Sequence, residues 1–396
     1  MLATYFDARA PRQTEKERRK MNIGSVPSSA PAQTVRRAAP DLDGAPRIRG
    51  GAASRLSPNV VTSRRFTPAW THEWSSSAGA AFQTFRASVF PFRFYFFHPL
   101  PYAERDMADN WIDGAAIAAQ IRQDVTAGVR ELSLKGRGVH LTAILIGSTA
   151  AGELYAERQR QACLAVGIQY ELRTLPADAK QHDVATLIQS LNHDPSITGI
   201  MLHLPVPRGL DATDLQYKID PVKDVEGVNP ANIGYVVYGH TLIAPCTALA
   251  VIELIKSTGV TLAGAEAVVV GASEIAGKPI ALLLTEQMAT VTLCHIATKD
   301  LPSHTRRAEI LVVAVGKPGL ITADHVREGA VVIDVGINRI TLPDGTKKTV
   351  GDVDADAVYP KVARLSPVPN GVGPMTVAML LKNTLRSAEL LERGAR

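Results

Sequence analysis

The sequence predicts an α/β protein whose organised part forms two α/β units with a ligand-binding cleft between them. From Trp111 onward, short apolar runs of strand length alternate with stretches of helical periodicity, which is the pattern of parallel sheets covered by helices. A glycine-bearing turn, from Gly271 to Gly277, directly follows one of these runs. Folds of this kind bind ligands where such turns leave the ends of parallel strands.

Residues 1–106 differ from the rest of the chain in charge and composition. They carry 16 Lys and Arg against 8 Asp and Glu, and they contain all 9 Phe of the 396 residues. Because they show no sustained period, we expect a disordered extension, or an upstream stretch that is not translated, with the native start at Met107. Arginines interleaved with aromatic residues, such as Arg64 with Phe66, would also suit a nucleic acid. We favour a disordered or untranslated segment over a nucleic-acid-binding one, and we expect no nucleic-acid partner.

The first unit begins with an amphipathic helix predicted over 114–132. Ile117, Ile121 and Val125 recur there at helical spacing, and Asp113 can cap the helix. Gly167 is suited to end the second helix of the unit, predicted over 154–166, because glycine adopts the left-handed conformation without steric cost. The elements that follow in this unit are a strand at 141–146, a helix at 154–166, a strand at 169–175, a helix at 183–192 and a strand at 199–204.

The second unit starts after Pro245 with a helix predicted over 247–258. Four apolar runs rich in β-branched residues follow, and a long helix is predicted over 376–391. The four strands are expected at 267–270, 290–294, 310–315 and 331–335. These boundaries divide the chain into residues 1–106, a first lobe over 107–245 that the terminal helix completes, and a second lobe over 246–375.

Composition excludes several classes of protein. Apolar residues make up 46% and charged residues 20%, which is typical of globular domains rather than of disordered chains or coiled coils. No run of about 18 uncharged apolar residues occurs, so we expect no membrane span. Cys163, Cys246 and Cys294 are too few and too scattered for a disulfide framework, which favours a reducing, cytoplasmic location. The histidines show no ligand spacing, so we expect no metal site.

The segment from Val268 to Pro279 reads VVVGASEIAGKP and predicts a strand, a tight turn and the start of a helix. Gly271 allows the turn, Ser273 is small enough for close approach of a phosphate, and Gly277 lets the helix pack on its strand. The helix N-terminus would offer free N–H groups to a pyrophosphate. Because Ser273 stands where a second glycine is usual, the turn by itself leaves dinucleotide binding and a purely structural turn open.

Further motifs follow this turn along the chain: TKDL at 298–301, VVAVGKPG at 312–319, VIDVGINR at 332–339, GDV at 351–353 and PVPNGVGPMT at 367–376. With the turn, they make residues 107–391 closely resemble the bifunctional methylenetetrahydrofolate dehydrogenase/methenyltetrahydrofolate cyclohydrolase (FolD) family. The resemblance implies two α/β lobes, the second a Rossmann domain that binds NADP or NAD, and a homodimer. It also implies oxidation of a reduced folate, 5,10-methylenetetrahydrofolate, by hydride transfer, and hydrolysis of the methenyl product to 10-formyltetrahydrofolate in one-carbon metabolism.

The resemblance also implies roles for individual residues. Tyr155 matches the family's active-site tyrosine beside the folate. The loop over 367–376 matches one that approaches folate and cofactor, so Pro369, Gly371 and Gly373 would contact the substrate. The positions that match the cofactor pocket are Gly271, Ala272, Ser273, Ile296, Gly316 and Ile337.

Three departures from the family pattern fall on the expected catalytic face. The family places a lysine four residues after the tyrosine, where this chain has Gln159, and a neutral amide cannot perform the acid/base work of hydrolysis. Arg160 lies about 100° further round the helix and is a poor base because of its very high pKa. His203 replaces the glutamine that supports the lysine and is either a replacement base or an orienting or structural residue. Glu226 replaces the aspartate that grips the pterin.

The cofactor end departs as well. The family usually has Arg-Ser where this chain has Ala272-Ser273, and Cys-His-Ser where it has Cys294-His295-Ile296. The arginine and the second serine are the groups that hold the 2′-phosphate of NADP. We therefore predict NAD or relaxed cofactor usage.

Three functional hypotheses follow. The first is a methylenetetrahydrofolate dehydrogenase with weakened or lost cyclohydrolase activity, in which Tyr155, Gln159, His203 and Glu226 form the catalytic face. The second is a fully bifunctional, NADP-dependent enzyme in which His203 or Arg160 compensates for the lysine. The third is a dehydrogenase for another reduced pterin, or a catalytically impaired folate-binding paralogue.

Overall fold

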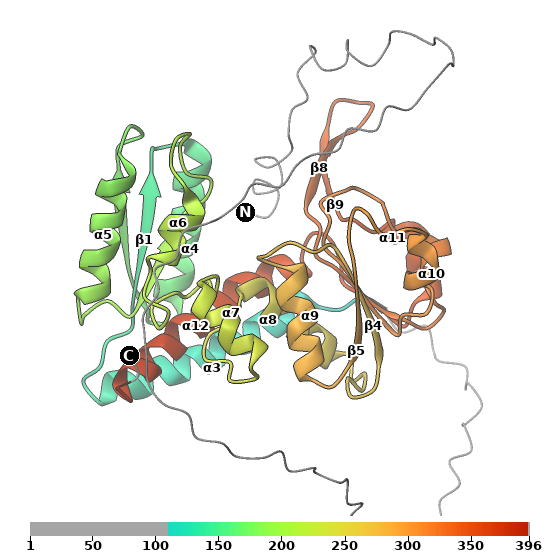
Figure 1. Ribbon diagram of the computed structural model, residues 1–396, viewed down its shortest axis with the longest axis horizontal. Coiled ribbons are helices and arrows are strands. Elements are labelled where there is room, and N and C mark those ends of the chain that lie inside the picture. The colour runs from blue at the N-terminus through green and yellow to red at the C-terminus, as the bar shows by residue number, and fades with distance from the viewer. Residues whose placement is uncertain (1–109, 395–396) are drawn as a thin grey trace, which may run out of the picture. The chain divides into compact units, whose positions relative to one another are not determined.

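The computed structural model describes residues 110–394, and the predictions for residues 1–106 fall outside this part of the chain. Within it, a three-stranded and a five-stranded parallel sheet are joined by long helices (Figure 1). Helices follow most of the strands along the chain, as the alternating pattern predicts. The expected α/β fold class is confirmed.

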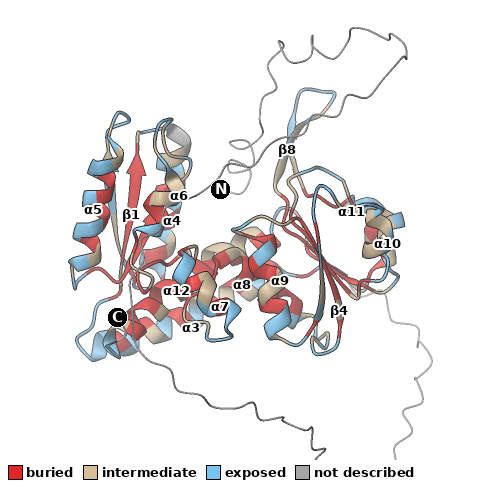
Figure 2. Cartoon of the chain, viewed as in Figure 1, coloured by how far each residue is buried: buried red, intermediate tan, exposed pale blue. Residues whose placement is uncertain are grey.

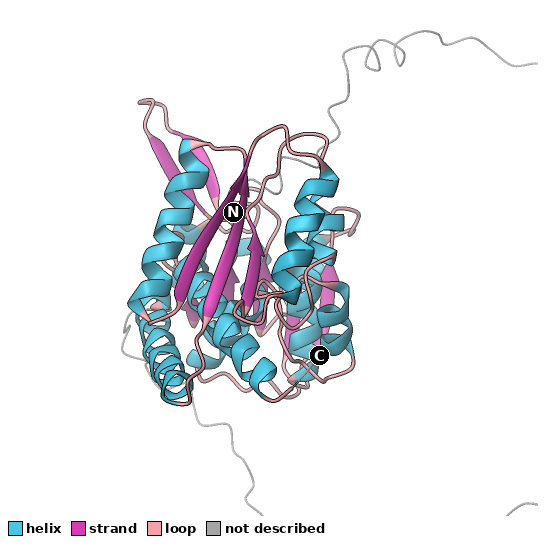
Figure 3. Cartoon of the chain, turned by 90° about the vertical axis from the view of Figure 1, so that its left-hand side faces the viewer, coloured by secondary structure: helices cyan, strands magenta, loops and turns pink. Residues whose placement is uncertain are grey.

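The three-stranded sheet has the order β2-β1-β3 and is parallel throughout. Its central strand is buried at every position after the first residue, whereas the outer strand β2 is largely exposed. The other edge strand, β3, is buried at all four positions, so the exposure of β2 does not follow from its edge position alone. Figure 3 views this sheet with helices beside it. The elements are β1 (His140–Ile146), α4 (Ala150–Ala165), β2 (Gln169–Leu175), α5 (Gln181–His193) and β3 (Gly199–Leu202).

The five-stranded sheet has the order β10-β7-β6-β4-β5 and is also parallel throughout. Its registers align the ends of the strands, since Val270 lies opposite both Cys294 and Val313, and Val313 lies opposite Asp334. The segments that leave these ends therefore gather at one edge of the sheet. The elements are β4 (Glu266–Val270), α9 (Gly277–Glu286), β5 (Thr290–Cys294), α10 (Leu301–Thr305), β6 (Ile310–Val313), β7 (Val331–Asp334), α11 (Ala355–Val358) and β10 (Arg364–Leu365).

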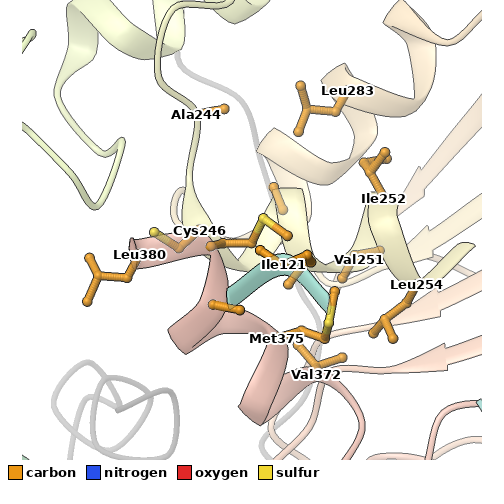
Figure 4. Packing of buried hydrophobic residues seen from close by; sticks show 14 of the residues in the cluster. Ile121, Ala244, Cys246, Val251, Ile252, Leu254, Leu283, Val372, Met375 and Leu380 are labelled. Carbon is orange, nitrogen blue, oxygen red and sulfur yellow. The ribbon is translucent and has the colours of Figure 1, made fainter. Parts of the chain in front are cut away.

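The largest apolar cluster joins the first and last helices of the described chain with a helix from its middle. Helix α12 (Val372–Glu392) packs against α3 (Gly114–Leu134) and α8 (Cys246–Ser257), and the three lie between the two sheets (Figure 1). Ile121, Leu254 and Met375 meet in this cluster (Figure 4), and Figure 2 shows its helix faces as buried. Each fully buried side chain of this size stabilises the fold by about 1.5 to 3 kcal/mol. The cluster therefore ties the first and last helices to the middle of the chain.

Several local predictions are confirmed by backbone geometry. Asp113 caps α3 by accepting a hydrogen bond from the N–H of Ala116 at 2.9 Å. Gly167 follows α4 with a φ of 84°, in the left-handed region. β2 and β5 have the predicted bounds. These features depend on residues close together in the chain, which is why local patterns predict them.

Other elements were not predicted or begin elsewhere. Helix α12 begins at Val372 rather than at residue 376, so Gly373 lies in its first turn and not in a loop. Strand β3 ends at Leu202, before the two residues that precede Pro205. The elements without a prediction are α6 (Ala212–Tyr217), α7 (Pro230–Val237), the antiparallel hairpin β8 (Asn338–Thr341) and β9 (Lys347–Val350), the short helix α11, the short strand β10, and 3-10 turns at Ala323–His325 and Tyr359–Lys361.

Among the described residues, no helix is long and apolar enough to cross a membrane. The same residues contain no group of three or more His, Cys, Asp or Glu side chains that could hold a metal ion. Cys163, Cys246 and Cys294 are free and buried.

Candidate active site

The carboxyl edge of the three-stranded sheet brings together three of the proposed catalytic residues. Tyr155 and Gln159 lie one turn apart on α4, which follows β1, and His203 directly follows β3. The backbone N–H of His203 donates to Ile144 of β1 at 2.9 Å, so the histidine stays attached to the sheet. The rings of Tyr155 and His203 meet edge to face, with centroids 5.4 Å apart. The predicted (i, i+4) pair therefore faces the strand end that carries the histidine.

Gln159 is the centre of a buried hydrogen-bond network. Its side chain is 4% exposed, and its Oε1 atom accepts from the hydroxyl of Tyr170 at 3.1 Å. The same oxygen lies 3.1 Å from Nε2 of His203. The amide nitrogen donates to Sδ of Met201 at 2.8 Å. Both ends of the amide are thus engaged by the protein itself.

His203 is held in its neutral form by its surroundings. The residue is 4% exposed, and burial lowers the pKa of its imidazole to about 4. Burial disfavours the charged form because the interior replaces water poorly as a solvent for charge. At pH 7 the ring is therefore an uncharged hydrogen-bonding group.

Arg160 does not join this network. Its guanidinium pairs with Glu157 on the exposed face of α4, at 2.7 Å through both Nε and Nη2. The pairing holds the pKa of the Glu157 carboxyl at about 2. The hypothesis that Arg160 replaces the lysine is therefore contradicted, because the helical rotation of one residue turns its side chain to the surface.

Glu226 belongs to a loop that carries two acidic residues. Burial and the charge of Asp224 raise the pKa of Glu226 to about 8, while a hydrogen bond from Gln216 of α6 works in the opposite direction. The charge of Glu226 in turn contributes, after burial, to raising the pKa of Tyr155. The Glu226 carboxylate is therefore close enough to Tyr155 for its charge to affect the pKa of the phenol.

Asp224 and Lys223 position that loop. Asp224 is 1% exposed and accepts from the backbone N–H of Asn229 at 2.7 Å and from Nδ2 of Asn232 at 3.1 Å. Lys223 is buried too, and its ammonium donates to the carbonyl oxygens of Leu191, Asn192 and Asp194 at 2.7 to 2.9 Å. These carbonyls lie at the end of α5, where a cation is favourable. The loop is therefore anchored from both sides.

The glycine turn after β4 has the tight geometry that its sequence predicts. Gly271 has a φ of 112°, and a Cβ atom there would collide with the carbonyl oxygen of Ala314, which follows β6. A Cβ atom on Gly277 would collide with the carbonyl oxygen of Gly271. Only glycine fits either position, because neighbouring backbone atoms fill the space that a side chain would need.

The start of α9 offers fewer N–H donors than expected. The N–H of Lys278 donates to the carbonyl oxygen of Ser273 at 3.0 Å, and the N–H of Gly277 to its hydroxyl at 3.4 Å. Pro279 has no N–H group. The expectation of free donors in the first turn of this helix is therefore wrong for these three residues, because the turn closes on Ser273.

The remaining proposed cofactor residues lie at the ends of neighbouring strands. Ile296 follows the edge strand β5, and its side chain is fully exposed. Gly316 follows β6, and Ile337 lies between β7 and β8. Asp352 connects the segments that carry these two residues, because its carboxylate accepts hydrogen bonds from the N–H of Gly316 and from Nδ2 of Asn338, the residue after Ile337. No charged side chain is contributed by Ala272 or Ile296.

The segment from Pro367 to Gly373 is fixed near the start of α3. The N–H of Gly371 donates to the carbonyl oxygen of Pro367 at 2.9 Å, and a Cβ atom on Gly114 would collide with the carbonyl oxygen of Gly371. Pro369 lies within this turn. A Cβ atom on Gly373 would meet no atom within 4 Å, so packing does not explain the glycine there. The assignment of these residues to the substrate remains a prediction.

A cavity of about 310 Å³ lies between α6, α7 and α9. Gln216, the hydrogen-bond partner of Glu226, lines one side, and Glu274 of the glycine turn and Lys278 of α9 line another. Its volume is at the lower end of the range for small-molecule pockets. The cavity thus connects the surroundings of Glu226 with the turn after β4.

Sequence reasoning missed four residues of this site. They are Tyr170, Met201, Gln216 and Asp352. Asp352 stands in the GDV motif, which was a usable signal. Tyr170, Met201 and Gln216 carry no motif, and only the pairing of the strands and the packing of α6 bring them to the site.

A tight glycine turn at the carboxyl edge of one parallel sheet, and a group formed by partly buried Tyr155 and Glu226 with buried Gln159 and His203 near the edge of another, are typical of a dinucleotide-binding α/β enzyme. Two family models match the chain: the catalytic domain of tetrahydrofolate dehydrogenase/cyclohydrolase over residues 112–226, and the NAD(P)-binding domain of the same enzymes over residues 245–392. The chain belongs to the tetrahydrofolate dehydrogenase/cyclohydrolase family. The predicted resemblance to this family and the NAD(P)-binding domain are confirmed.

Individual relatives agree with this assignment. Bifunctional protein FolD 1 of Rubrobacter xylanophilus is 49% identical over 284 residues, which cover 72% of this chain and 99% of that protein. The FolD crystal structure from Campylobacter jejuni has a TM-score of 0.67 and 41% identity, covering 70% of this chain and 98% of its own. A Trypanosoma brucei FolD structure, complexed with NADP and an inhibitor, has a TM-score of 0.67 and 37% identity, covering 71% and 98%.

Proposed function

We propose that this chain oxidises 5,10-methylenetetrahydrofolate by hydride transfer to NAD(P), and that its hydrolysis of the methenyl product is weakened. The observation that carries the second part is the state of Gln159, which is buried, neutral and hydrogen-bonded at both ends of its amide. A lysine at this place could exchange a proton, whereas an amide cannot near neutral pH. Hydrolysis needs such an exchange because water loses a proton when it attacks.

The dehydrogenase step makes different demands on the chain. A bound nicotinamide supplies the hydride acceptor, so the protein needs to align the donor carbon and exclude water. Tyr155 packs against the main apolar cluster and meets His203 edge to face. These contacts support a fixed aromatic surface against which the pterin ring of the substrate can pack. Glu226, with its pKa raised to about 8, is mostly protonated at pH 7 and can both donate to and accept from a pterin. None of these roles requires the lysine.

The cofactor proposal concerns the preference between NAD and NADP. Ala272 and Ile296 replace the arginine and serine that the family uses for the 2′-phosphate, and neither brings a charge. A charge-assisted contact is among the strongest that a phosphate makes, so its loss weakens the preference for NADP. We therefore propose NAD or relaxed usage, with the dinucleotide held by Gly271, Ser273, Gly316 and Ile337.

The homodimer and the cytoplasmic location are parts of the same proposal. Sedimentation of the purified protein would test the first, and fractionation of cells the second. A monomeric protein would contradict the homodimer, and enrichment of the protein with an oxidising compartment would contradict the cytoplasmic location. Neither result would affect the proposed chemistry.

A fully bifunctional enzyme is the second candidate. One observation supports it: Nε2 of His203 lies 3.1 Å from Oε1 of Gln159, so an imidazole that could act as a base stands beside the position of the family's lysine. The low pKa of this imidazole, about 4, makes it a weak base and favours the first candidate.

One assay separates these candidates. Purified protein receives 5,10-methylenetetrahydrofolate with NAD or NADP, and the reduced nicotinamide and the methenyl absorbance are followed together. We expect reduced cofactor with accumulating methenyl product, and NADP turnover less than tenfold above NAD turnover. Reduced cofactor without accumulation would support the bifunctional enzyme. The absence of both signals would contradict the proposed substrate and favour another reduced pterin or a non-catalytic role.

A further inference from the structure

The orientation of the Gln159 amide is set by Met201. A thioether sulfur only accepts hydrogen bonds, so the group that faces Sδ of Met201 must be the NH2 end of the amide. In the opposite orientation, the amide oxygen would face the sulfur with no hydrogen between them. The other two neighbours do not distinguish the orientations, because a tyrosine hydroxyl and an imidazole nitrogen can each donate or accept.

The amide orientation then determines which nitrogen of His203 carries the proton. With its nitrogen on Met201, Gln159 presents Oε1 to Nε2 of His203 at 3.1 Å. An oxygen acceptor requires a proton on Nε2. The neutral ring then has its lone pair on Nδ1. Within the described residues, Nδ1 has no hydrogen-bond partner and is not among the fully buried unpartnered atoms, which are Thr142 Oγ1 and His304 Nδ1.

We infer that Met201 and Gln159 are positioning residues that hold His203 as the Nε2–H tautomer and leave Nδ1 as the accepting nitrogen of the site. Tyr170 supports this arrangement, because its hydroxyl donates to the same amide oxygen at 3.1 Å. The chemical part of the inference rests on the proposed function: Nδ1 accepts the proton of the attacking water in the residual hydrolysis.

The step balances without a further reactant. The water oxygen bonds to the bridging carbon of the methenyl cation while the π electrons move to nitrogen, and one water proton passes to Nδ1. The bond from that carbon to N5 then breaks, its electron pair stays on N5, and N5 takes the remaining hydroxyl proton. Loss of the Nδ1 proton to solvent returns the neutral ring and leaves 10-formyltetrahydrofolate.

Nitrogen NMR of the full chain, labelled with ¹⁵N-histidine, tests the tautomer at pH 7. The signal of His203 is identified by its loss in His203→Asn. We expect an unprotonated Nδ1 and a protonated Nε2. Gln159→Lys should invert this pattern, because an ammonium donates to Nε2 and leaves the proton on Nδ1. Gln161→Lys, which adds the same charge to the exposed face of α4, should leave it unchanged.

Met201→Leu removes the sulfur while nearly keeping the side-chain volume. Both amide orientations then become close in energy, so we expect the two tautomers in similar amounts and hydrolysis reduced by about twofold. Met379→Leu is the matched control, since Met379 is a fully buried methionine of α12 in the main apolar cluster. It should keep the wild-type pattern and rate.

Two results would overturn the inference. One is a wild-type His203 with its proton on Nδ1, or charged at pH 7. The other is a Met201→Leu protein whose spectrum matches that of Met379→Leu. Failure of the proposed function would give a different result. The wild-type protein would form no reduced nicotinamide, although His203 would still show the expected tautomer.

Discussion

The carboxylate of Asp352 holds Gly316 in place. Its Oδ2 atom accepts hydrogen bonds from the N–H of Gly316 at 2.9 Å and of Val315 at 2.7 Å, while Oδ1 accepts from Nδ2 of Asn338 at 2.8 Å. Asp352 is completely buried. One side chain therefore connects the loop after β6 with the start of β8, and these two segments carry Gly316 and Ile337 of the proposed cofactor pocket.

Asp352→Asn should loosen these loops. An amide has one accepting oxygen instead of two, so at least one of the buried N–H groups loses its partner. We expect the free energy of unfolding to fall by about 1 to 3 kcal/mol and dinucleotide affinity to fall as well, measured by chemical denaturation and calorimetry. Asp356→Asn, which removes an exposed carboxylate from α11, is the control. Equal behaviour of the two variants would show that Asp352 does not organise the pocket.

Gln159→Lys tests the proposed cause of weak hydrolysis. The variant restores an exchangeable proton at the family's lysine position, so we expect the cyclohydrolase rate to rise by at least about tenfold with little change in hydride transfer. Gln161→Lys controls for the added charge. If neither rate changes, His203 and Glu226 have altered the site beyond rescue by one residue, and Gln159 is not the cause.

Arg160→Gln tests the excluded alternative. Since the guanidinium pairs with Glu157 at the surface, its removal should leave both the dehydrogenase and the cyclohydrolase rates as they are. Both rates are measured by following the reduced nicotinamide and the methenyl absorbance together. A selective loss of hydrolysis would place Arg160 in the site and contradict the geometry.

Ala272→Arg combined with Ile296→Ser should shift the cofactor preference. The arginine supplies a charge-assisted contact and the serine a hydroxyl, so the ratio of kcat/KM for NADP over NAD should rise by about tenfold. Thr285→Arg adds the same charge at the other end of α9 as a control. An unchanged ratio would mean that these two positions do not face the adenosine ribose.

Glu226 makes stability depend on pH. Its pKa is raised to about 8 by burial and by Asp224, above its ordinary value of 4.5, so the folded state binds this proton more tightly than the unfolded state. Its contribution therefore stabilises the protein at low pH and is lost as the pH rises from about 4.5 to about 8.

Glu226→Gln should remove this dependence. At pH 9 we expect the variant to exceed the wild type in free energy of unfolding by on the order of 5 kcal/mol, measured by denaturation at several pH values. Glu328→Gln, at an exposed position, should follow the wild type. Parallel curves for wild type and Glu226→Gln would contradict the raised pKa.

Elements with a strong local pattern were predicted well, and elements that depend on distant contacts were not. The apolar runs of β1, β4 and β6 and the helix that places Tyr155 four residues before Gln159 are visible in the chain. The helices α6 and α7 are short, with 6 and 8 residues, and show too few turns for a period to appear. The start of α12 was placed four residues late because Gly371 and Gly373 suggested a loop.

The order of strands and helices, the glycine turn and the absence of the family's lysine follow from the amino-acid sequence alone, since each depends on residue types at short spacing. The sequence left open whether His203 is a base, an orienting residue or a structural one. Only tertiary structure decides its surroundings: Gln159 of α4 contacts His203, and Met201 of β3 and Tyr170 of β2 contact Gln159 in turn. They meet because β2 and β3 pair with β1 on opposite sides and α4 packs against this sheet. A hydrogen bond needs its partners within about 3 Å and correctly oriented, and no spacing along the chain encodes that.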